Sequence, residues 1–401
     1  MRLLNGNVYL AEQGFVKRDL LLRNGIIERI VPQGATAGET VSRGGETAGN
    51  AVSCGSECVK TEVSDEEIVD VHGAFVLPGL VDLHFHGCAG HDVCEGSREA
   101  LAAIEQYELK HGVTSIAPAT MTLSEERLSE ICAAAADYAK ESECFKGIYL
   151  EGPFLSEAKK GAQNSDYLRL PDAGLLHRLN ARAEGLIRIV AVAPELEGAL
   201  ACMEACKEAF RFSIAHTTAD YRTCAEAMQR GARQVTHLYN AMPPFTHREP
   251  GVIGAAFDYG ADVELISDGV HVDACAVRAA FKLFGEEHVI LISDSMMAAG
   301  MPDGMYELGG QAVKVCGNRA VLLNGTIAGS VTNLYDCMVA AIRMGIAPEA
   351  AVRAATINPA AALGIDAEYG SIESGKKADL LVVNGDWELQ KVYKHGREVR
   401  R

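Results

Sequence analysis

Eight short apolar segments, each followed by a stretch of helical composition, do most to limit how this chain can fold. They contain many β-branched residues and lie at 79–86, 113–119, 147–152, 187–195, 212–217, 233–238, 262–269 and 289–295. The stretches between them include SREALAAIEQYELKHG and SEERLSEICAAAADYAK. Eight strand-then-helix units over about 250 residues are typical of a (β/α)8 barrel. We therefore expect an α/β fold of the TIM-barrel type.

The two ends of the chain have a different pattern. Residues 1–33, and the segment from about Tyr369 to the C-terminus, alternate apolar and polar side chains between turn residues. Such alternation is typical of short antiparallel strands. We expect 1–76 and 366–401 to form one small β-sandwich domain, and 77–365 to form the barrel. The stretch 34–67 is rich in Gly, Ser, Thr and Glu, and we expect it to be a mobile insertion.

Charge and cysteine usage limit the possible partners and the compartment. The 401 residues carry a formal net charge of −17 and no basic block, so nucleic acid and anionic membranes are poor partners. The N-terminus lacks the apolar core of a signal peptide, and no apolar run reaches the length of a membrane span. The 12 Cys are scattered without a C-x2-C pair, which indicates reduced thiols in the cytoplasm.

Side chains that can bind a metal or transfer a proton stand at the ends of five of the eight segments. The carboxyl ends of barrel strands meet at one mouth, where active sites form. We therefore expect these residues to converge. They are His84 and His86 in the first segment, Glu151 in the third, His216 in the fifth, His237 in the sixth and Asp294 in the eighth.

The H-x-H spacing adds a geometric argument. Side chains alternate along a strand, so His84 and His86 point the same way and can bind one ion. Imidazole and carboxylate ligands suit Zn, Fe, Co or Mn, and the nearby Cys88 offers a soft ligand. Taken singly, each histidine could be a hydrogen-bonded structural residue, Glu151 could simply end a strand, and Asp294 could be a helix N-cap. Their matching positions favour a shared metal site.

Several motifs together resemble a known family. In order along the chain they include VLPGLVDLHFHG, YLEGPF, KKGAQN, IAHTTA, THLYNAM, REPGVIGAA, SDGVH, ISDSMMAAG and GTIAGS. They resemble the N-acetylglucosamine-6-phosphate deacetylases of the amidohydrolase superfamily, from about residue 70 to the C-terminus. H-x-H alone is common to many amidohydrolases, whereas LEGPF, THLYNAMPPF and REPG in this order are specific.

The resemblance implies a metal centre. Glu151, His216 and His237 match the metal ligands of the family, and His84 and His86 match a pair that contributes to a second site. The implied cofactor is a divalent cation, Zn or Fe, with one or two ions per subunit.

The resemblance also implies the reaction and the substrate. Asp294 matches the acid/base that takes a proton from water and returns it to the departing nitrogen. The implied reaction hydrolyses N-acetyl-D-glucosamine 6-phosphate to D-glucosamine 6-phosphate and acetate. The family is typically dimeric, and Arg248 matches a residue that reaches the phosphate in the neighbouring subunit. Substrate contacts are implied at Ala162, Gln163, Asn240, Ala241, Arg248, His271, Ile327, Ala328 and Gly329.

Three positions depart from the family pattern. Gln163 stands where a His usually contacts the substrate, and an amide cannot become cationic, which leaves the sugar preference open. Ala215 replaces a Gly before His216, and Ser295 replaces an Ala after Asp294.

Three other functions stay open. An N-acetylgalactosamine 6-phosphate deacetylase differs in substrate by one epimeric hydroxyl. Many other amidohydrolases bridge two metals with a carboxylated Lys, but the third and fourth segments contain no Lys. A sugar-phosphate sensor without catalysis would have no need of an acid/base beside the metal ligands.

Overall fold

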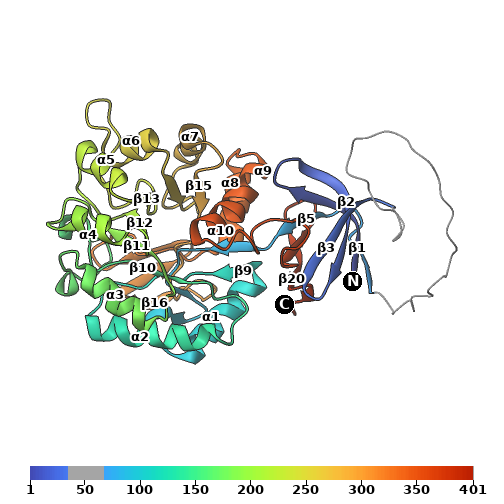
Figure 1. Cartoon of the computed structure of the whole chain (residues 1–401), viewed down its shortest axis with the longest axis horizontal. Helices are drawn as coiled ribbons and strands as arrows, with labels where there is room; N and C mark the ends of the chain where they lie inside the picture. Colours follow the sequence, from blue (N-terminus) through green and yellow to red (C-terminus); the bar gives the residue numbers. More distant parts are fainter. Residues whose placement is uncertain (35–66, 401) are drawn as a thin grey trace, which may run out of the picture.

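The computed structural model describes residues 1–34 and 67–400, and it contains a barrel of parallel strands beside a second sheet (Figure 1). Each barrel strand overlaps one of the eight predicted segments, so the α/β fold of TIM-barrel type is confirmed. The strands are β6 (Leu80–Asp82), β9 (Val113–Ile116), β10 (Ile148–Leu150), β11 (Ile187–Val192), β12 (Arg211–Ile214), β13 (Ala232–Val235), β14 (Asp262–Leu265) and β15 (Val289–Leu291).

Backbone pairing closes the barrel. Strands β10 to β15 form a continuous parallel sheet in chain order, and β6 pairs with β9. A parallel bridge between Ile116 and Phe145 joins β9 to the start of β10. Beyond the last strand, the amide of Asp294 donates to the carbonyl of His84 at 3.0 Å, which joins the end of β15 to the end of β6.

Alternating side chains build the core on both sides of the barrel wall. Tyr149, Ile189 and Ala191 belong to one buried cluster that gathers side chains from several barrel strands, whereas Ile148 and Val190 belong to a second cluster that also contains helix residues. The helices are α1 (Arg98–Lys110), α2 (Glu125–Ala139), α3 (Ala173–Arg182), α4 (Ala199–Cys206), α5 (Tyr221–Gln229), α6 (Gly251–Tyr259), α7 (Ala274–Phe284), α8 (Leu334–Arg343), α9 (Pro348–Ala355) and α10 (Ile357–Leu363).

Helix starts follow from local sequence. Ser97 and Ser124 are N-caps whose hydroxyls accept from the amides of Ala100 at 3.1 Å and Arg127 at 3.2 Å. Such caps satisfy amides that have no partner in the first helical turn. None of the helices among the described residues has the length and apolar character needed to cross a bilayer.

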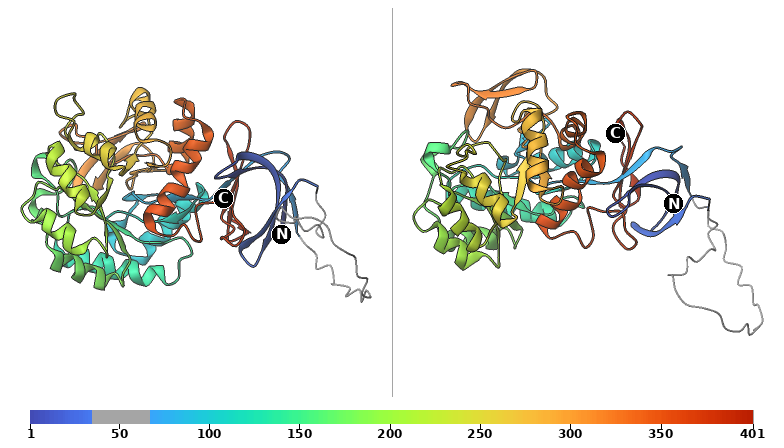
Figure 2. Two further views of the ribbon diagram at one scale, coloured as in Figure 1. Left: turned by 45° about the horizontal axis from the view of Figure 1, so that its top comes forward. Right: turned by 90° about the horizontal axis from the view of Figure 1, so that it is seen from above.

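Both ends of the chain contribute to one further sheet (Figure 2). Strand β5 lies between β1 and β19, so the N- and C-terminal segments are joined by hydrogen bonds. The sandwich of two packed sheets stays a prediction, and residues 35–66 of the expected insertion lie outside the described part. The strands are β1 (Arg2–Leu10), β2 (Gly14–Arg23), β3 (Ile26–Pro32), β4 (Ile68–Asp70), β5 (Phe75–Pro78), β19 (Leu380–Val383), β20 (Leu389–Lys394) and β21 (Arg397–Glu398).

A buried ion pair connects this terminal sheet to the barrel. The ammonium of Lys394 lies 2.7 Å from a carboxylate oxygen of Asp379, and both side chains are buried. The same ammonium donates to the carbonyl of Thr114, at the start of β9, at 2.8 Å. The contact therefore lies at the amino ends of the barrel strands.

A small antiparallel sheet after β15 was not predicted. It consists of β16 (Gly304–Leu308), β17 (Gln311–Cys316) and β18 (Arg319–Leu322), drawn in orange in Figure 2. Its apolar face forms a cluster of its own with Met121 and Met296. The remaining short elements are β7 (Gly87–Cys88), β8 (His91–Asp92) and the 3-10 turns η1 (Val93–Glu95), η2 (Glu157–Lys159) and η3 (Ser165–Tyr167).

Candidate active site

The predicted polar residues converge at the carboxyl ends of the barrel strands. Glu151 follows β10, His216 and His237 follow β12 and β13, and Asp294 follows β15. Tyr149 faces the barrel interior, so alternation along β10 directs Glu151 to the same side. Glu151 is 2% exposed, and it lies at the centre of the group.

Three of these residues have left-handed backbone conformations. The φ angle is 42° at His216, 29° at His237 and 48° at Asp294. Such values cost a side-chain-bearing residue of the order of 1 kcal/mol or more, and they occur where the surrounding structure imposes them. Because no helix starts at Ser295, Asp294 is not an N-cap, and that alternative is wrong.

One group consists of Glu151, His216 and His237. An oxygen of Glu151 lies 3.1 Å from Nε2 of His216 and 3.2 Å from Nε2 of His237, and the two Nε2 atoms are 3.1 Å apart. Nδ1 of His216 lies 2.8 Å from the carbonyl oxygen of Lys159. Since a carbonyl only accepts, the neutral ring carries its proton on Nδ1, and Nε2 presents a lone pair to the group.

This donor set fits a divalent cation. Two imidazole nitrogens and a carboxylate oxygen directed at one point are the usual ligands of Zn²⁺ and Fe²⁺ in proteins. The two Nε2 atoms and the Glu151 oxygen lie within 3.2 Å of one another, so a cation between them would be shared by all three. The geometry therefore favours a cation at this point.

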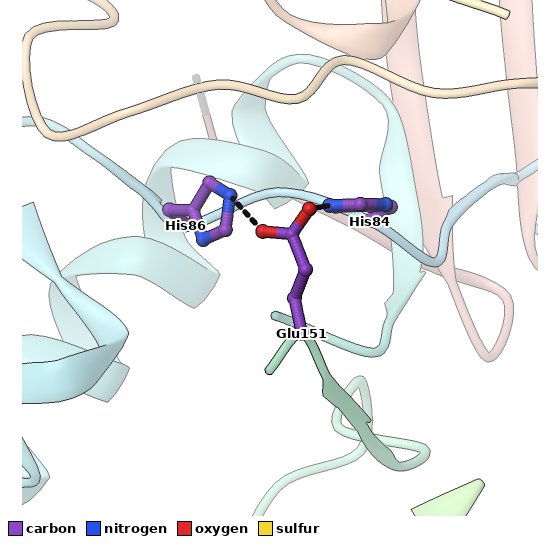
Figure 3. Close-up of side chains that lie close together, drawn as sticks. All are labelled: His84, His86 and Glu151. Carbon is purple, nitrogen blue, oxygen red and sulfur yellow. Dashed lines mark ion pairs between the residues drawn. The ribbon is translucent and has the colours of Figure 1, made fainter. Parts of the chain in front are cut away.

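A second group shares the same carboxylate (Figure 3). Nε2 of His86 lies 3.3 Å from one oxygen of Glu151, and Nε2 of His84 lies 3.7 Å from the other. Nδ1 of His86 lies 3.3 Å from the carbonyl oxygen of Ala119, which directs Nε2 into the site. The two imidazoles thus converge on one carboxylate, as the H-x-H spacing predicted.

A buried carboxylate behind His84 was missed from the sequence. Glu264 lies 2.7 Å from Nδ1 of His84, and the amide of Gln234 donates to the other Glu264 oxygen at 2.5 Å. Such contacts orient a ligand and raise its basicity. The available signal was a charged residue inside the apolar segment DVELISDG. Cys88, by contrast, contacts the carbonyl of Ile104 at 3.8 Å, and neither metal-binding group in the described residues contains it.

The carboxylates and histidines shift one another's ionisation. Burial raises the pKa of Glu151, but hydrogen bonds from His216 and His237 outweigh burial and hold that pKa well below its usual range. Burial lowers the pKa of His86, but Asp294 and Glu151 outweigh it and raise that pKa to about 10. The site therefore attracts positive charge strongly.

Asp294 is a carboxylate next to both histidines of the second group. Its Oδ1 lies 3.4 Å from Nε2 of His86 and 3.8 Å from Nε2 of His84. Burial raises the pKa of Asp294, but the hydrogen bond from His86 and the nearby imidazoles outweigh it and hold the pKa below its usual value. An ionised carboxylate at this position can accept a proton.

A cavity of about 550 Å³ opens above these groups. Lys159, Lys160, Asn324 and Thr326 also line it. Three of them lie in the motifs KKGAQN and GTIAGS, but no role had been predicted for any of the four. Nδ1 of His271 is held 2.8 Å from Asp268. Of the predicted substrate contacts, the cavity wall includes Ala162, Gln163, Asn240, Ala241, His271, Ile327 and Gly329.

Two predicted contacts lie elsewhere. Ala328 is fully buried behind the wall. Arg248 is exposed on the segment before α6 and does not line the cavity. Within one chain, Arg248 therefore lies outside the cavity wall.

Comparisons with known proteins agree with this geometry. The model of the amidohydrolase family matches residues 75–399. An N-acetylglucosamine-6-phosphate deacetylase from Bacillus subtilis is 38% identical over 340 residues, which cover 82% of this chain and 85% of the relative. An N-acetylgalactosamine-6-phosphate deacetylase from Escherichia coli O157:H7 is 33% identical over 331 residues, which cover 80% and 87%.

A solved structure is similar over nearly the whole chain. A mutant N-acetyl-D-glucosamine-6-phosphate deacetylase from Mycobacterium smegmatis, in complex with N-acetyl-D-glucosamine-6-phosphate, has a TM-score of 0.88 at 29% identity. The alignment covers 99% of this chain and 98% of that one.

Proposed function

Because this chain belongs to the amidohydrolase family, among its N-acetylglucosamine-6-phosphate deacetylases, we propose that it hydrolyses N-acetyl-D-glucosamine 6-phosphate to D-glucosamine 6-phosphate and acetate. The observation that carries the proposal is the convergence of Glu151, His216 and His237 on one point beside the carboxylate of Asp294. A metal-ligand set next to a proton acceptor in a cavity of sugar size suits amide hydrolysis.

In this proposal Glu151, His216 and His237 hold a divalent cation, Zn²⁺ or Fe²⁺, and His84 and His86 with Glu151 offer a second position. A cation held there would supply Lewis-acid activation of water and of the amide carbonyl. Asp294, ionised before the reaction, accepts a proton from the attacking water. It then returns that proton to the departing nitrogen, which leaves as an amine.

The phosphate is the part of the substrate that this acidic chain must bind against its overall charge. Lys159 and Lys160 line the cavity with cationic side chains, and the imidazole of His271 in the same wall can form a hydrogen bond to substrate. We propose that Arg248 of a second copy completes the phosphate site, because a guanidinium binds phosphate with two parallel hydrogen bonds.

A homodimer is consistent with the surface around Arg248. Phe245 and Phe257, on the same segment and on α6, are 53% and 51% exposed. Large exposed apolar side chains are typical of contact surfaces.

We also propose a cytoplasmic location and a division of the chain into a terminal domain (1–76 plus 366–401) and a barrel (77–365).

N-acetylgalactosamine 6-phosphate is a second candidate substrate, because one relative of this chain acts on it. The relative from Escherichia coli O157:H7 is an N-acetylgalactosamine-6-phosphate deacetylase, and the two sugars differ by one epimeric hydroxyl. The sugar preference is therefore the part of the proposal most open to change.

To test this proposal, the metal content of the purified protein is measured, and acetate release is then assayed. The substrates are N-acetylglucosamine 6-phosphate, its galacto epimer and unphosphorylated N-acetylglucosamine. We expect the gluco phosphate to have the highest kcat/KM. A higher value for the galacto epimer would move the specificity and keep the chemistry. Bound metal with no acetate release from any substrate would favour a sugar-phosphate sensor.

A further inference from the structure

We propose that Gln163 is a positioning residue for the metal ligand Glu151 and that it does not bind the sugar. The inference rests on the proposed function only in taking Glu151 as a metal ligand. The family resemblance suggested a substrate contact at this position, and the hydrogen bonds of the amide point to a different role.

The orientation of the Gln163 amide is fixed by its two partners. Its nitrogen donates to Oε2 of Glu151 at 2.6 Å, and its oxygen accepts from the backbone amide of Thr122 at 2.7 Å. A backbone amide only donates, and an ionised carboxylate only accepts, so the reverse orientation would break both bonds. The side chain is therefore held at both ends.

These bonds leave the Gln163 amide little hydrogen-bonding capacity for a substrate. Gln163 is 2% exposed, and the sulfur of Met121 lies 3.7 Å from its amide nitrogen. A sugar group that used the same N–H or the same lone pair of the amide would have to replace Glu151 or Thr122. Leaving a buried carboxylate or amide without its partner costs about 1 to 3 kcal/mol, which opposes such an exchange.

The bond to Glu151 acts on the metal-binding geometry. With Oε2 held by Gln163, Oε1 faces the Nε2 atoms of His216 and His237. Loss of the amide would allow the carboxylate to rotate and would raise the entropy cost of binding an ion. Removing such outer partners typically lowers metal affinity by about 10- to 100-fold.

The same loop also holds a second ligand. The carbonyl of Lys159 accepts from Nδ1 of His216 at 2.8 Å, four residues before Gln163. The loop is fixed in turn from β17, because the side-chain amide of Gln311 donates to the carbonyl of Ala162. One loop thus contacts two of the three residues of the first group.

The test compares Gln163→Met with Gln311→Met. Both replace an amide by a side chain of similar length without a donor, but only Gln163 touches Glu151. Zn²⁺ affinity is measured by competition with a chromophoric chelator, which needs no turnover. We expect Gln163→Met to weaken Zn²⁺ binding by about 10-fold or more, and Gln311→Met to change it less than 3-fold.

Kinetics with saturating Zn²⁺ separate the two roles. We expect the KM of Gln163→Met for the phosphorylated sugar to stay within 3-fold of the parent. Unchanged Zn²⁺ affinity, or equal losses in both variants, would overturn the proposal, as would a KM raised more than 10-fold at full metal occupancy. The Zn²⁺ readout still decides if none of the sugars proves to be a substrate.

If Gln163→Met fails to fold, Gln163→Leu replaces it. The leucine side chain has neither a donor nor an acceptor, so this variant also removes the bond to Glu151. We expect a loss of Zn²⁺ affinity of about 10-fold or more. An affinity equal to the parent's would overturn the proposal.

Discussion

The two ends of the barrel use buried charge in different ways. At the carboxyl ends of the strands, Glu151 and Asp294 lie among four imidazoles, and three residues have left-handed backbone conformations. At the amino ends, Lys394 meets Asp379, and each is paired and hydrogen-bonded. At the carboxyl ends, ligand atoms stay available for a cation and a substrate. At the amino ends, the two charges neutralise each other within the protein. This contrast separates residues needed for chemistry from residues needed for stability.

The largest effect is expected at the mouth. Asp294→Asn removes the proton acceptor while keeping the shape, and we expect kcat to fall by about 10³-fold. The free energy of unfolding should change by no more than about 1 kcal/mol. Acetate release and urea unfolding measure these two quantities, and metal analysis checks that the variant is loaded. Near-normal turnover in a metal-loaded variant would refute the acid/base role.

At the amino ends of the barrel strands, a substitution should lower stability and leave kcat unchanged. Lys394→Met leaves the Asp379 carboxylate buried without its partner, and we expect a loss of stability of about 3 kcal/mol. The kcat of the folded enzyme should not change. Lys391→Met on the same strand is the matched control, because its pair with Glu398 is exposed and is worth about 0.5 kcal/mol. Equal losses in the two variants would remove the distinction between the ends.

A variant of Arg248 tests whether the phosphate site of the cavity needs a residue from a second chain. We expect Arg248→Ala to raise the KM for the phosphorylated sugar by about 10- to 100-fold, the value of a charged hydrogen bond. The KM for the unphosphorylated sugar should change little. Adding a catalytically inactive Asp294→Asn subunit that retains Arg248 should restore part of the affinity in mixed dimers. Equal effects on both sugars would exclude Arg248 from phosphate binding.

The smallest effect concerns a buried carboxyl on α1. Glu108 is fully buried, and the weakly donating thiol of Cys88 lies beside its carboxyl. Burial, followed by the charge of Asp82, raises the pKa of Glu108 well above its usual value. The folded state therefore holds this proton more tightly than the unfolded chain, so the stability it contributes is present at low pH.

That contribution is lost as the pH rises from the unfolded pKa towards the higher folded pKa. In Glu108→Gln this loss is absent. We expect the variant to gain stability relative to the parent as the pH rises from 5 to 8. Urea unfolding at the two pH values measures the difference. A constant difference between variant and parent would show that Glu108 is not protonated in the folded state.

Much of the fold could be predicted from the sequence. The eight apolar segments correspond to strands because burial on both faces demands continuous β-branched runs. The residues that end them converge because parallel strands bring their carboxyl ends together. The antiparallel sheet β16 to β18 was missed because its strands are partly exposed, and such segments resemble loops in composition.

Contacts between distant segments could not be predicted. Glu264 behind His84, Gln163 behind Glu151 and the pairing of Lys394 with Asp379 depend on which side chains face each other across strands. Simple alternation also fails for His216, because Ala215 belongs to the buried cluster that faces the barrel interior. Because His216 has a left-handed backbone conformation, its side chain can point inward like that of Ala215.

The sequence by itself determined the barrel, the order of its strands and the residue types at its mouth, because periodicity and composition are local properties of the chain. Only the tertiary structure decided which nitrogen of each imidazole faces the site, which carboxylates are paired and how the Gln163 amide is used. Those features depend on distances of about 3 Å between residues far apart in sequence, and closure of the barrel sets such distances.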